Sequence, residues 1–170
     1  MIGSPSQDLL NTDHELAGLV FDFLLDFGRF EYALKAAGFA VSRNGRANPD
    51  WPRFETMARG FLGSLDGDEN EAVAYLLAEP PKTQVYRNGQ LGWVETTQKA
   101  DEERDAFLLR LVRTVRNNLF HGGKYPLGVT RDRLLLGHAR TVLWASLRVD
   151  SDVQHEFFSG RELLVLPDTD

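Results

Sequence analysis

The chain has 170 residues and a net charge of −6, and its 42% hydrophobic and 26% charged residues are typical of one ordinary globular domain. It contains no cysteine, so disulfides, thiolate catalysis and cysteine-ligated metal sites are excluded. Its four histidines show no metal-ligand spacing such as H-x-x-x-H, and we therefore expect neither a metal ion nor another cofactor.

The sequence carries no targeting signal that we can identify. The first residues, MIGSPSQDLLNTDH, lack the basic start and the apolar run of a signal peptide. No apolar run approaches the roughly 20 residues that span a bilayer. We therefore expect a cytoplasmic protein without a membrane partner. No change in composition divides the chain, so residues 1–170 are expected to form a single domain.

Residues 12–37 predict a long first helix. Thr12 and Glu15 match a capping box, in which each side chain satisfies a free backbone N–H group of the other residue. Gly38 is a suitable stop, because glycine adopts the left-handed conformation cheaply after a last turn. Apolar residues recur at helical spacing along this segment: Leu16, Leu19, Val20, Phe23, Phe27, Phe30 and Leu34.

Two shorter helices are expected after a polar loop at residues 42–50. Asp50 is expected to cap the first of them, and Asp68, with a glutamate three residues later, is expected to begin the second. For residues 84–94 two interpretations remain open. One is a β-hairpin with its turn at Asn88-Gly89, and the other is an exposed loop.

Residues 98–121 form the clearest predicted helix, with Leu108, Leu111, Val112, Val115 and Leu119 on one face. The acidic run at 101–103 is expected in its first turn, where the helix dipole favours negative charge. A last long helix is predicted from Thr130 through Val149, with a continuation to Phe158 left open. The sum is an all-α bundle of four or five helices, to which a β-hairpin near 84–94 is an optional addition.

The end of the helix at 98–121 reads TVRNNLFHGGKYP, residues 114–126. Helix termination alone explains this composition, because Arg and His complement the negative end of the dipole and Gly122 is a standard residue past the cap. Asn117 and His121 are four residues apart, however, and share a face that is directed away from the apolar stripe. Arg113 and Arg116 are interleaved with that face, which suits a cleft or a two-fold subunit interface.

Positive charge is concentrated around the same segment. Residues 104–140 contain eight basic residues but only Asp105 and Asp132 as acidic ones. A basic segment in an acidic protein can meet a polyanion locally, or it can simply form solvated helix faces. Charge alone favours the second interpretation.

RNNLFH reads as R-x4-H with Asn directly after Arg, and it resembles the signature of the HEPN superfamily, the nucleotide-binding helical domains of prokaryotes and eukaryotes. Residues 28–39, GRFEYALKAAGF, also resemble the first long helix of bacterial members. The resemblance implies a helical bundle that dimerises through the motif helices. For many members it implies a metal-independent endoribonuclease that acts as a toxin or in host defence.

Carried over by position, the resemblance implies that Arg116 and His121 are the catalytic pair and that Asn117 supports them. Histidine exchanges protons near neutral pH, with the attacking 2′-hydroxyl or with the leaving 5′-oxygen. Arginine grips a phosphate oxygen and stabilises the charge that develops on it. The expected products carry a 2′,3′-cyclic phosphate and a 5′-hydroxyl. The residues expected to hold the flanking RNA backbone are Arg113, Lys124, Arg131 and Arg133.

Several alternatives stay open. Glu31 and Tyr32 reach Arg116 from the first helix, or they are a surface carboxylate and a packing ring, and the second interpretation is favoured. Some family toxins carry a tyrosine two residues after the histidine, which a partner nucleotidyltransferase modifies. Here that position is Gly123, and Tyr125 comes later. A nucleotidyltransferase or an antitoxin partner and a modification of Tyr125 are therefore left open.

Two other functions compete with the ribonuclease. One is a non-catalytic HEPN-like module that acts as a dimer and binds RNA, a nucleotide or a protein. The other is a structural dimer in which the motif only caps a helix.

Overall fold

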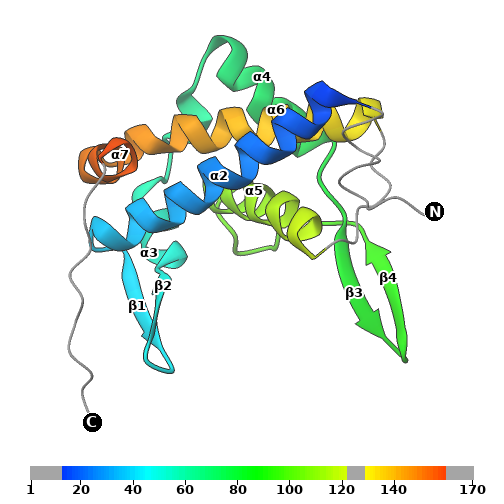
Figure 1. Cartoon of the computed structure of the whole chain (residues 1–170), viewed down its shortest axis with the longest axis horizontal. Helices are drawn as coiled ribbons and strands as arrows, with labels where there is room; N and C mark the ends of the chain where they lie inside the picture. The colour runs from blue at the N-terminus through cyan, green and yellow to red at the C-terminus, as the bar shows by residue number, and fades with distance from the viewer. Residues whose placement is uncertain (1–12, 122–128, 160–170) are drawn as a thin grey trace.

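The computed structural model describes residues 13–121 and 129–159, and these residues are mostly helical (Figure 1). The helices are α2 (His14–Ala36), α3 (Trp51–Met57), α4 (Gly67–Ala78), α5 (Arg104–Phe120), α6 (Val129–Ser146) and α7 (Ser151–Phe158), with short 3₁₀ turns at Leu62–Ser64 and Leu147–Val149. The strands form two antiparallel hairpins, β1 (Ala40–Arg43) with β2 (Arg46–Pro49) and β3 (Thr83–Arg87) with β4 (Gln90–Val94). The prediction of a mostly helical fold is confirmed, and the structure has two small hairpins where the sequence offered one near 84–94 as an option.

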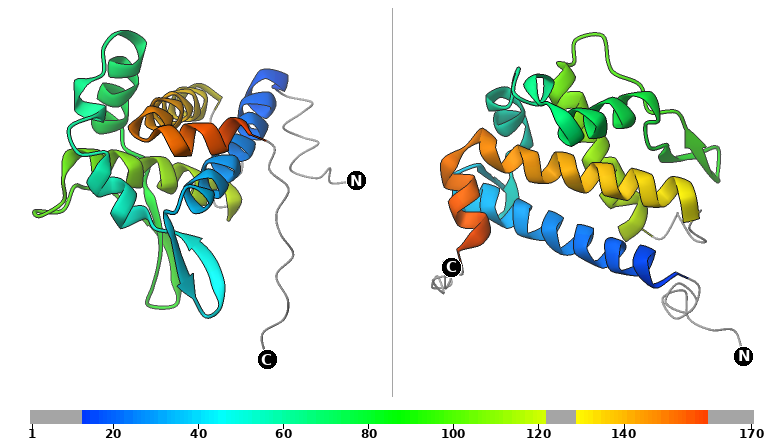
Figure 2. Two further views of the ribbon diagram at one scale, coloured as in Figure 1. Left: turned by 90° about the vertical axis from the view of Figure 1, so that its left-hand side faces the viewer. Right: turned by 90° about the horizontal axis from the view of Figure 1, so that it is seen from above.

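The helices pack around α6. Helices α2 and α6 lie side by side, and α7 packs against α2 after the chain turns back from α6 (Figures 1 and 2). Helix α4 packs on α6 from one side and α5 packs on it from the other. Both hairpins project from the side of the molecule that α5 occupies. One cluster of buried apolar residues extends through these helices, from Leu16 to Phe157.

Aromatic rings occupy one end of this core. Phe30 stacks on Trp51 with ring centroids 5.9 Å apart and meets Phe54 edge-on at 5.5 Å. Phe27 also stacks on Trp51, at 5.9 Å, and Phe39 meets Phe54 at 5.5 Å. We call this group the aromatic cluster; its members are Phe23, Phe27, Phe30, Phe39, Trp51 and Phe54. It holds α2, α3 and the beginning of hairpin β1–β2 together.

The ends of the first helices follow local capping rules, with two corrections. Asp13 is the N-cap of α2 and accepts a hydrogen bond from the Leu16 N–H group at 2.9 Å, so the predicted cap at Thr12, which lies outside the described residues, is wrong. Gly38 has a φ of +88° directly after α2, which confirms the predicted stop. Asp50 caps α3 as predicted. Asp66 is the N-cap of α4, which begins at Gly67, so the cap lies two residues before the predicted one at Asp68.

Both hairpins turn on the dipeptide Asn-Gly. Asn44 and Gly45 have φ values of +53° and +73°, and Asn88 and Gly89 have values of +51° and +79°. Two successive residues in the left-handed region form the two-residue turn that matches the twist of antiparallel strands. The hairpin alternative for residues 84–94 is thereby confirmed. The polar loop predicted at residues 42–50 is wrong, because most of that segment is hairpin β1–β2.

The predicted last helix corresponds to α6 and the 3₁₀ turn that follows it, and the continuation to Phe158 that was left open is a separate helix, α7. Asp150 separates them, because its carboxylate accepts hydrogen bonds from the N–H groups of Asp152 and Val153 and so begins a new helix. Arg29 of α2 donates to the carbonyl oxygens of Glu156 at 2.6 Å and Phe157 at 2.7 Å. These bonds fasten the end of α7 to α2.

Helix α5 begins at Arg104, six residues later than predicted, so the acidic run at 101–103 precedes it. The expectation that this run lies in the first turn is therefore wrong. The Glu102 carboxylate instead accepts two hydrogen bonds from the Arg110 guanidinium, both at 2.6 Å. These bonds are the main reason why the pKa of Glu102 lies below its usual value. These bonds hold the residues that directly precede α5 against the helix.

The aromatic cluster predicts a large stability effect for Phe30→Ala. Removing this fully buried ring leaves a cavity between α2 and α3, and we expect the free energy of unfolding to fall by about 3–5 kcal/mol. Urea denaturation followed by circular dichroism measures it. Tyr86→Ala removes a ring that is 70% exposed and is the matched control, with an expected change of less than about 0.5 kcal/mol. Equal losses for the two variants would contradict this account of the core.

The Glu102–Arg110 pair predicts a pH-dependent stability difference. Because the folded-state pKa of Glu102 is depressed, its contribution is present above the unfolded-state pKa of about 4.3 and is lost as the pH falls through the folded-state value. Glu102→Gln should therefore be less stable than the wild type by about 1–3 kcal/mol at pH 7, and the difference should shrink at acidic pH. Glu103→Gln is the control, because Glu103 forms only an exposed 3.8 Å pair with Arg59. A pH-independent difference for Glu102→Gln would refute this assignment.

Candidate functional site

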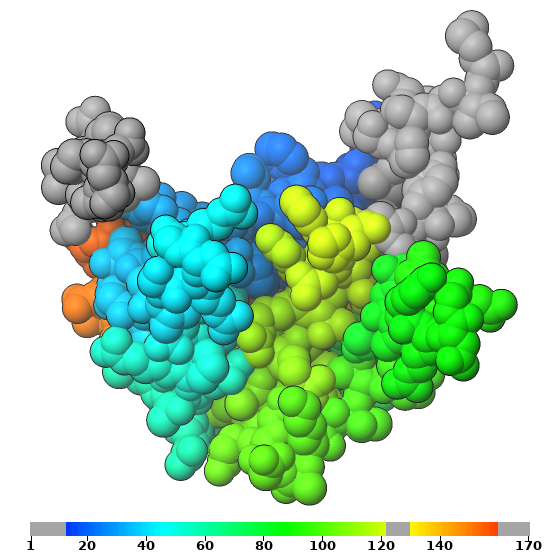
Figure 3. All heavy atoms as spheres, turned by 90° about the horizontal axis from the view of Figure 1, so that it is seen from below, coloured from blue at the N-terminus to red at the C-terminus, as the bar shows by residue number. Residues whose placement is uncertain are grey.

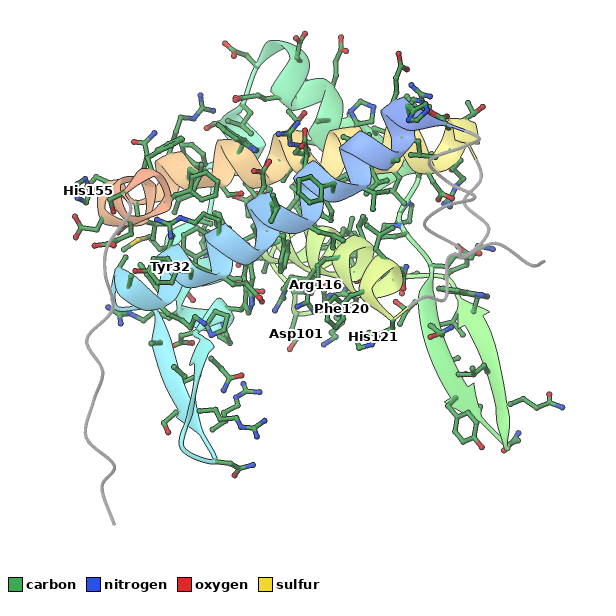
Figure 4. The ribbon with its side chains drawn as sticks, in the orientation of Figure 1. Tyr32, Asp101, Arg116, Phe120, His121 and His155 are labelled. Atoms are coloured by element: carbon green, nitrogen blue, oxygen red, sulfur yellow. The ribbon has the colours of Figure 1, made fainter. Side chains whose placement is uncertain are left out.

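The sequence RNNLFH forms the last turn of α5 (Figure 4). Arg116 to Phe120 are helical, and His121 is the C-cap, whose N–H group donates to the Asn117 carbonyl oxygen at 3.0 Å. The side chains of Asn117, Phe120 and His121 are exposed, and that of Arg116 is half-buried. The structure thus places the three predicted catalytic residues together at one exposed helix end.

Aromatic rings and weak polar contacts position the Arg116 guanidinium. It lies 4.8 Å from the ring centroid of Phe120 and 5.5 Å from that of Phe27, a member of the aromatic cluster. One nitrogen donates to the Asn117 side-chain oxygen at 3.1 Å. The Glu31 carboxylate is 3.9 Å away, which is too long for a hydrogen bond. No further polar partner of Arg116 is found within residues 13–121 and 129–159, so relative to these residues most of its N–H donors are available to an anion such as phosphate.

Glu31 and Tyr32 of the first helix were the candidate neighbours of Arg116, and among these two only Glu31 approaches it. The 3.9 Å approach of Glu31 makes it a weak ion-pair partner rather than a plain surface carboxylate. Tyr32 instead packs under the guanidinium of Arg29, 4.5 Å from its ring centroid. The favoured interpretation was therefore right for Tyr32 and wrong for Glu31.

Phe120 connects the two outer residues of the motif. Its ring contacts the Arg116 guanidinium, and it meets the His121 imidazole edge-on, with centroids 5.7 Å apart and planes at 88°. The ring is nevertheless 66% exposed. Sequence reasoning assigned no function to Phe120, although a large apolar side chain between Arg116 and His121 was a usable signal.

Asn118, the second asparagine of the motif, has a different role. It is buried, and its side-chain amide donates to the Lys82 carbonyl oxygen at 2.7 Å. Lys82 directly precedes β3, so this bond ties the base of hairpin β3–β4 to the last turn of α5. Sequence analysis missed this bond, because it joins segments that are distant in the chain.

Three of the four predicted RNA-binding residues lie in the described structure, and each has a partner within the protein. Arg113 pairs with Glu55 and lies 4.8 Å from the ring centroid of Trp51, and burial lowers its pKa. Arg131 donates to the Pro80 carbonyl oxygen at 3.3 Å. Arg133 pairs with Asp13 at 2.7 Å and with Glu15. Lys124 lies outside the described residues. An RNA-binding role for these residues stays a prediction, and the three described ones already have partners within the protein.

The basic segment as a whole is largely neutralised by carboxylates from other parts of the chain. Besides the pairs of Arg110, Arg113 and Arg133, Arg140 binds Asp26 at 2.6 Å and Asp22 at 3.2 Å. These guanidinium groups bind the outer helices to the core of the molecule. The guanidinium groups of Arg110, Arg113, Arg133 and Arg140 thus fit neither interpretation of the basic segment, because they bind carboxylates rather than a polyanion or solvent alone.

Two open pockets are lined by residues that the structure describes, and neither lining includes a residue of the motif. One open pocket of about 350 Å³ lies between α3 and the residues that directly precede α5, and its lining includes Glu55, Lys99 and Glu102. Another, of about 460 Å³, is lined by residues of α7 that include His155. Within residues 13–121 and 129–159, no three His, Asp or Glu side chains are grouped as metal ligands, and no helix is long and apolar enough to cross a bilayer. Within the described residues the side chains of Asn117, Phe120 and His121 are exposed, so they are accessible from solvent.

Comparison of the chain with protein-family models, with curated proteins and with solved structures finds no match. Function is therefore inferred from the geometry at the end of α5 and from the HEPN-like pattern of RNNLFH.

Proposed function

We propose that the protein is a homodimeric HEPN-like endoribonuclease that cleaves RNA without a metal ion, in a toxin or defence role. One observation carries the proposal: Arg116 and His121 lie at the same exposed helix end, and both contact the ring of Phe120. A guanidinium with available donors and an accessible imidazole are the two groups that RNA cleavage through the 2′-hydroxyl needs.

The proposed reaction is an internal transesterification. The 2′-oxygen of a nucleotide forms a bond to the adjacent phosphorus, and the bond from phosphorus to the 5′-oxygen of the next nucleotide breaks. The 2′-oxygen loses a proton and the 5′-oxygen gains one, so no net proton is consumed. His121 serves one of these transfers, and in a dimer a second copy of His121 is available for the other. Arg116 stabilises the negative charge on the non-bridging phosphate oxygens.

Exposed apolar side chains on α2 and at the motif support the homodimer. Phe21 and Leu25 lie one turn apart on the outer face of α2 and are 63% and 57% exposed, and Phe120 of α5 is 66% exposed. Exposed apolar groups of this kind mark association surfaces. A two-fold axis at this face would bring two copies of the α5 end together, as in the HEPN bundle that the resemblance implies. We place such an enzyme in the cytoplasm, with an antitoxin or a nucleotidyltransferase as the expected class of protein partner.

The central test is RNA cleavage in the presence of EDTA. The purified wild type should cleave single-stranded RNA, and His121→Ala should lower the rate at least about 100-fold, because proton transfer by a positioned side chain supplies about that factor. His155→Ala removes another exposed histidine, on α7, and is the matched control that should retain the wild-type rate. Gel electrophoresis of end-labelled RNA measures the rates.

Two results of this test would refute the enzyme. Equal activity of the wild type and His121→Ala would exclude a role of this imidazole. A wild type that is inert on diverse RNAs would exclude the reaction. RNA binding without cleavage would then favour the non-catalytic module, and a change in thermal stability alone would favour the structural dimer.

Phe120 is proposed as a positioning residue, and its two contacts predict how substitutions act. Phe120→Leu removes the ring that contacts both Arg116 and His121, so kcat should fall about tenfold or more while KM changes little. Phe120→Tyr keeps the ring and should restore most of the rate. Steady-state kinetics with a fluorogenic RNA oligonucleotide separates the two constants. A leucine variant at the wild-type rate, or a tyrosine variant no better than leucine, would show that the ring does not position the pair.

A further inference from the structure

The two hairpins share an unusual composition. Their turns read Arg43-Asn44-Gly45 and Arg87-Asn88-Gly89, with arginine directly before the turn in both cases. The chain contains 25 acidic residues, but neither residues 40–49 nor residues 83–94 include one. In a protein with a net charge of −6, these two projections are locally positive. This composition favours contact with an anion.

Hairpin β1–β2 has two arginines directly opposite each other. Arg43 pairs with Arg46 in the strand register, and both residues are exposed. Like charges at directly opposed positions destabilise a hairpin. No carboxylate of the described residues forms a salt bridge with either guanidinium. A bound phosphate backbone would relieve this repulsion.

Hairpin β3–β4 has an exposed aromatic face. Tyr86 lies opposite Leu91, and both are 70% exposed; Trp93 lies opposite Gln84 and is 40% exposed. Alternate residues of a strand share one face, so these four side chains project from the same side of the hairpin. Aromatic rings on an open, positively charged surface bind single-stranded nucleic acid by stacking on its bases.

The hairpins flank the proposed site. Both project from the side that α5 occupies, one on each side of it (Figures 1 and 2), and the space-filling view shows the end of α5 between them, with the surface hollowed beside hairpin β1–β2 (Figure 3). Their bases are fixed. Asn118 binds the start of β3–β4, and Phe39 of the aromatic cluster directly precedes β1. The hairpins therefore hold a defined position relative to Arg116.

We propose that hairpins β1–β2 and β3–β4 are two arms that bind single-stranded RNA on either side of the α5 end. Arg43 and Arg46 bind backbone phosphates on one side, and Tyr86 stacks on a base while Arg87 binds a phosphate on the other. This inference rests on the proposed function in taking RNA as the substrate. It assigns RNA binding to residues whose side chains have no salt bridge within residues 13–121 and 129–159, whereas Arg113, Arg131 and Arg133 are already bound within the fold.

Salt-dependent binding tests the arginines. The probe is a fluorescein-labelled, mixed-sequence RNA of about 20 nucleotides, and the protein is the full chain with His121→Ala, so that cleavage is slow during the binding measurement. For a single strand, each arginine that no longer binds a phosphate lowers the slope of log K against log salt by about 0.7. Arg43→Gln with Arg46→Gln should therefore lower it by about 1.4 and weaken binding about tenfold at low salt. Arg59→Gln with Arg148→Gln removes the same charge from exposed residues outside the hairpins and should leave Kd within about twofold.

Stacking is tested separately with Tyr86. Tyr86→Ala in the same background should raise Kd about fivefold or more without changing the salt slope, because base stacking releases no counterions. Tyr86→Phe keeps the ring and should bind like its parent. Thermal melting of each variant should match that of the parent, since all the substituted side chains are exposed.

The outcomes separate this inference from the enzyme proposal. One outcome is that the hairpin variants bind RNA with the Kd and salt slope of the parent, while the wild type cleaves RNA through His121. This outcome refutes RNA binding by the hairpins and leaves the enzyme proposal intact. Arm-dependent RNA binding by a protein that cleaves nothing supports the arms and overturns the enzyme. If the parent binds no RNA at any salt concentration, the proposal that the hairpins bind RNA is refuted, and a protein becomes the expected partner of these hairpins.

Discussion

The stacking of α2 on Trp51 is the interaction on which the rest of the structure depends. Phe27 and Phe30 each stack on this ring at 5.9 Å, and they thereby fix α3 and the start of hairpin β1–β2 against α2. The same rings also support the proposed site, because the guanidinium of Arg113 lies over the ring of Trp51 and that of Arg116 lies over the ring of Phe27. Buried rings therefore set the orientation of the last turn of α5, although the motif itself lies at the surface.

The distribution of positive charge follows from this packing. Arginines along α5 and α6 neutralise carboxylates of distant segments and hold the helices together, as Arg110 does with Glu102 and Arg140 with Asp26. Available guanidinium donors remain at Arg116 and at the hairpin tips. An acidic protein arranged in this way repels a polyanion over much of its surface and attracts it at one face. In the proposed function, such a field favours one orientation of the RNA, with a phosphate near the end of α5.

The parts of the fold that local patterns encode could be predicted from the sequence. Helical periodicity identified α2 and α5, and the Asn88-Gly89 turn indicated one hairpin. The first hairpin was missed although Asn44-Gly45 is the same dipeptide, because its strands are short and polar and show no apolar alternation. The position of RNNLFH at a helix end was predictable, since the apolar stripe ends there. The partner of Arg113 was not, because Glu55 is 58 residues away in the chain. The contact of Phe120 with Arg116 follows the i, i+4 spacing of a helix, whereas its edge-on contact with His121 depends on side-chain geometry.

The central claim is that the end of α5 cleaves RNA through the 2′-hydroxyl without a metal ion. The most direct measurement compares an RNA oligonucleotide with the same molecule carrying one 2′-deoxy nucleotide, placed immediately before the mapped cleavage position, in EDTA. The account predicts that cleavage at this linkage disappears while cleavage elsewhere continues, and that the all-RNA product ends in a 2′,3′-cyclic phosphate. Continued cleavage at the 2′-deoxy position would contradict it.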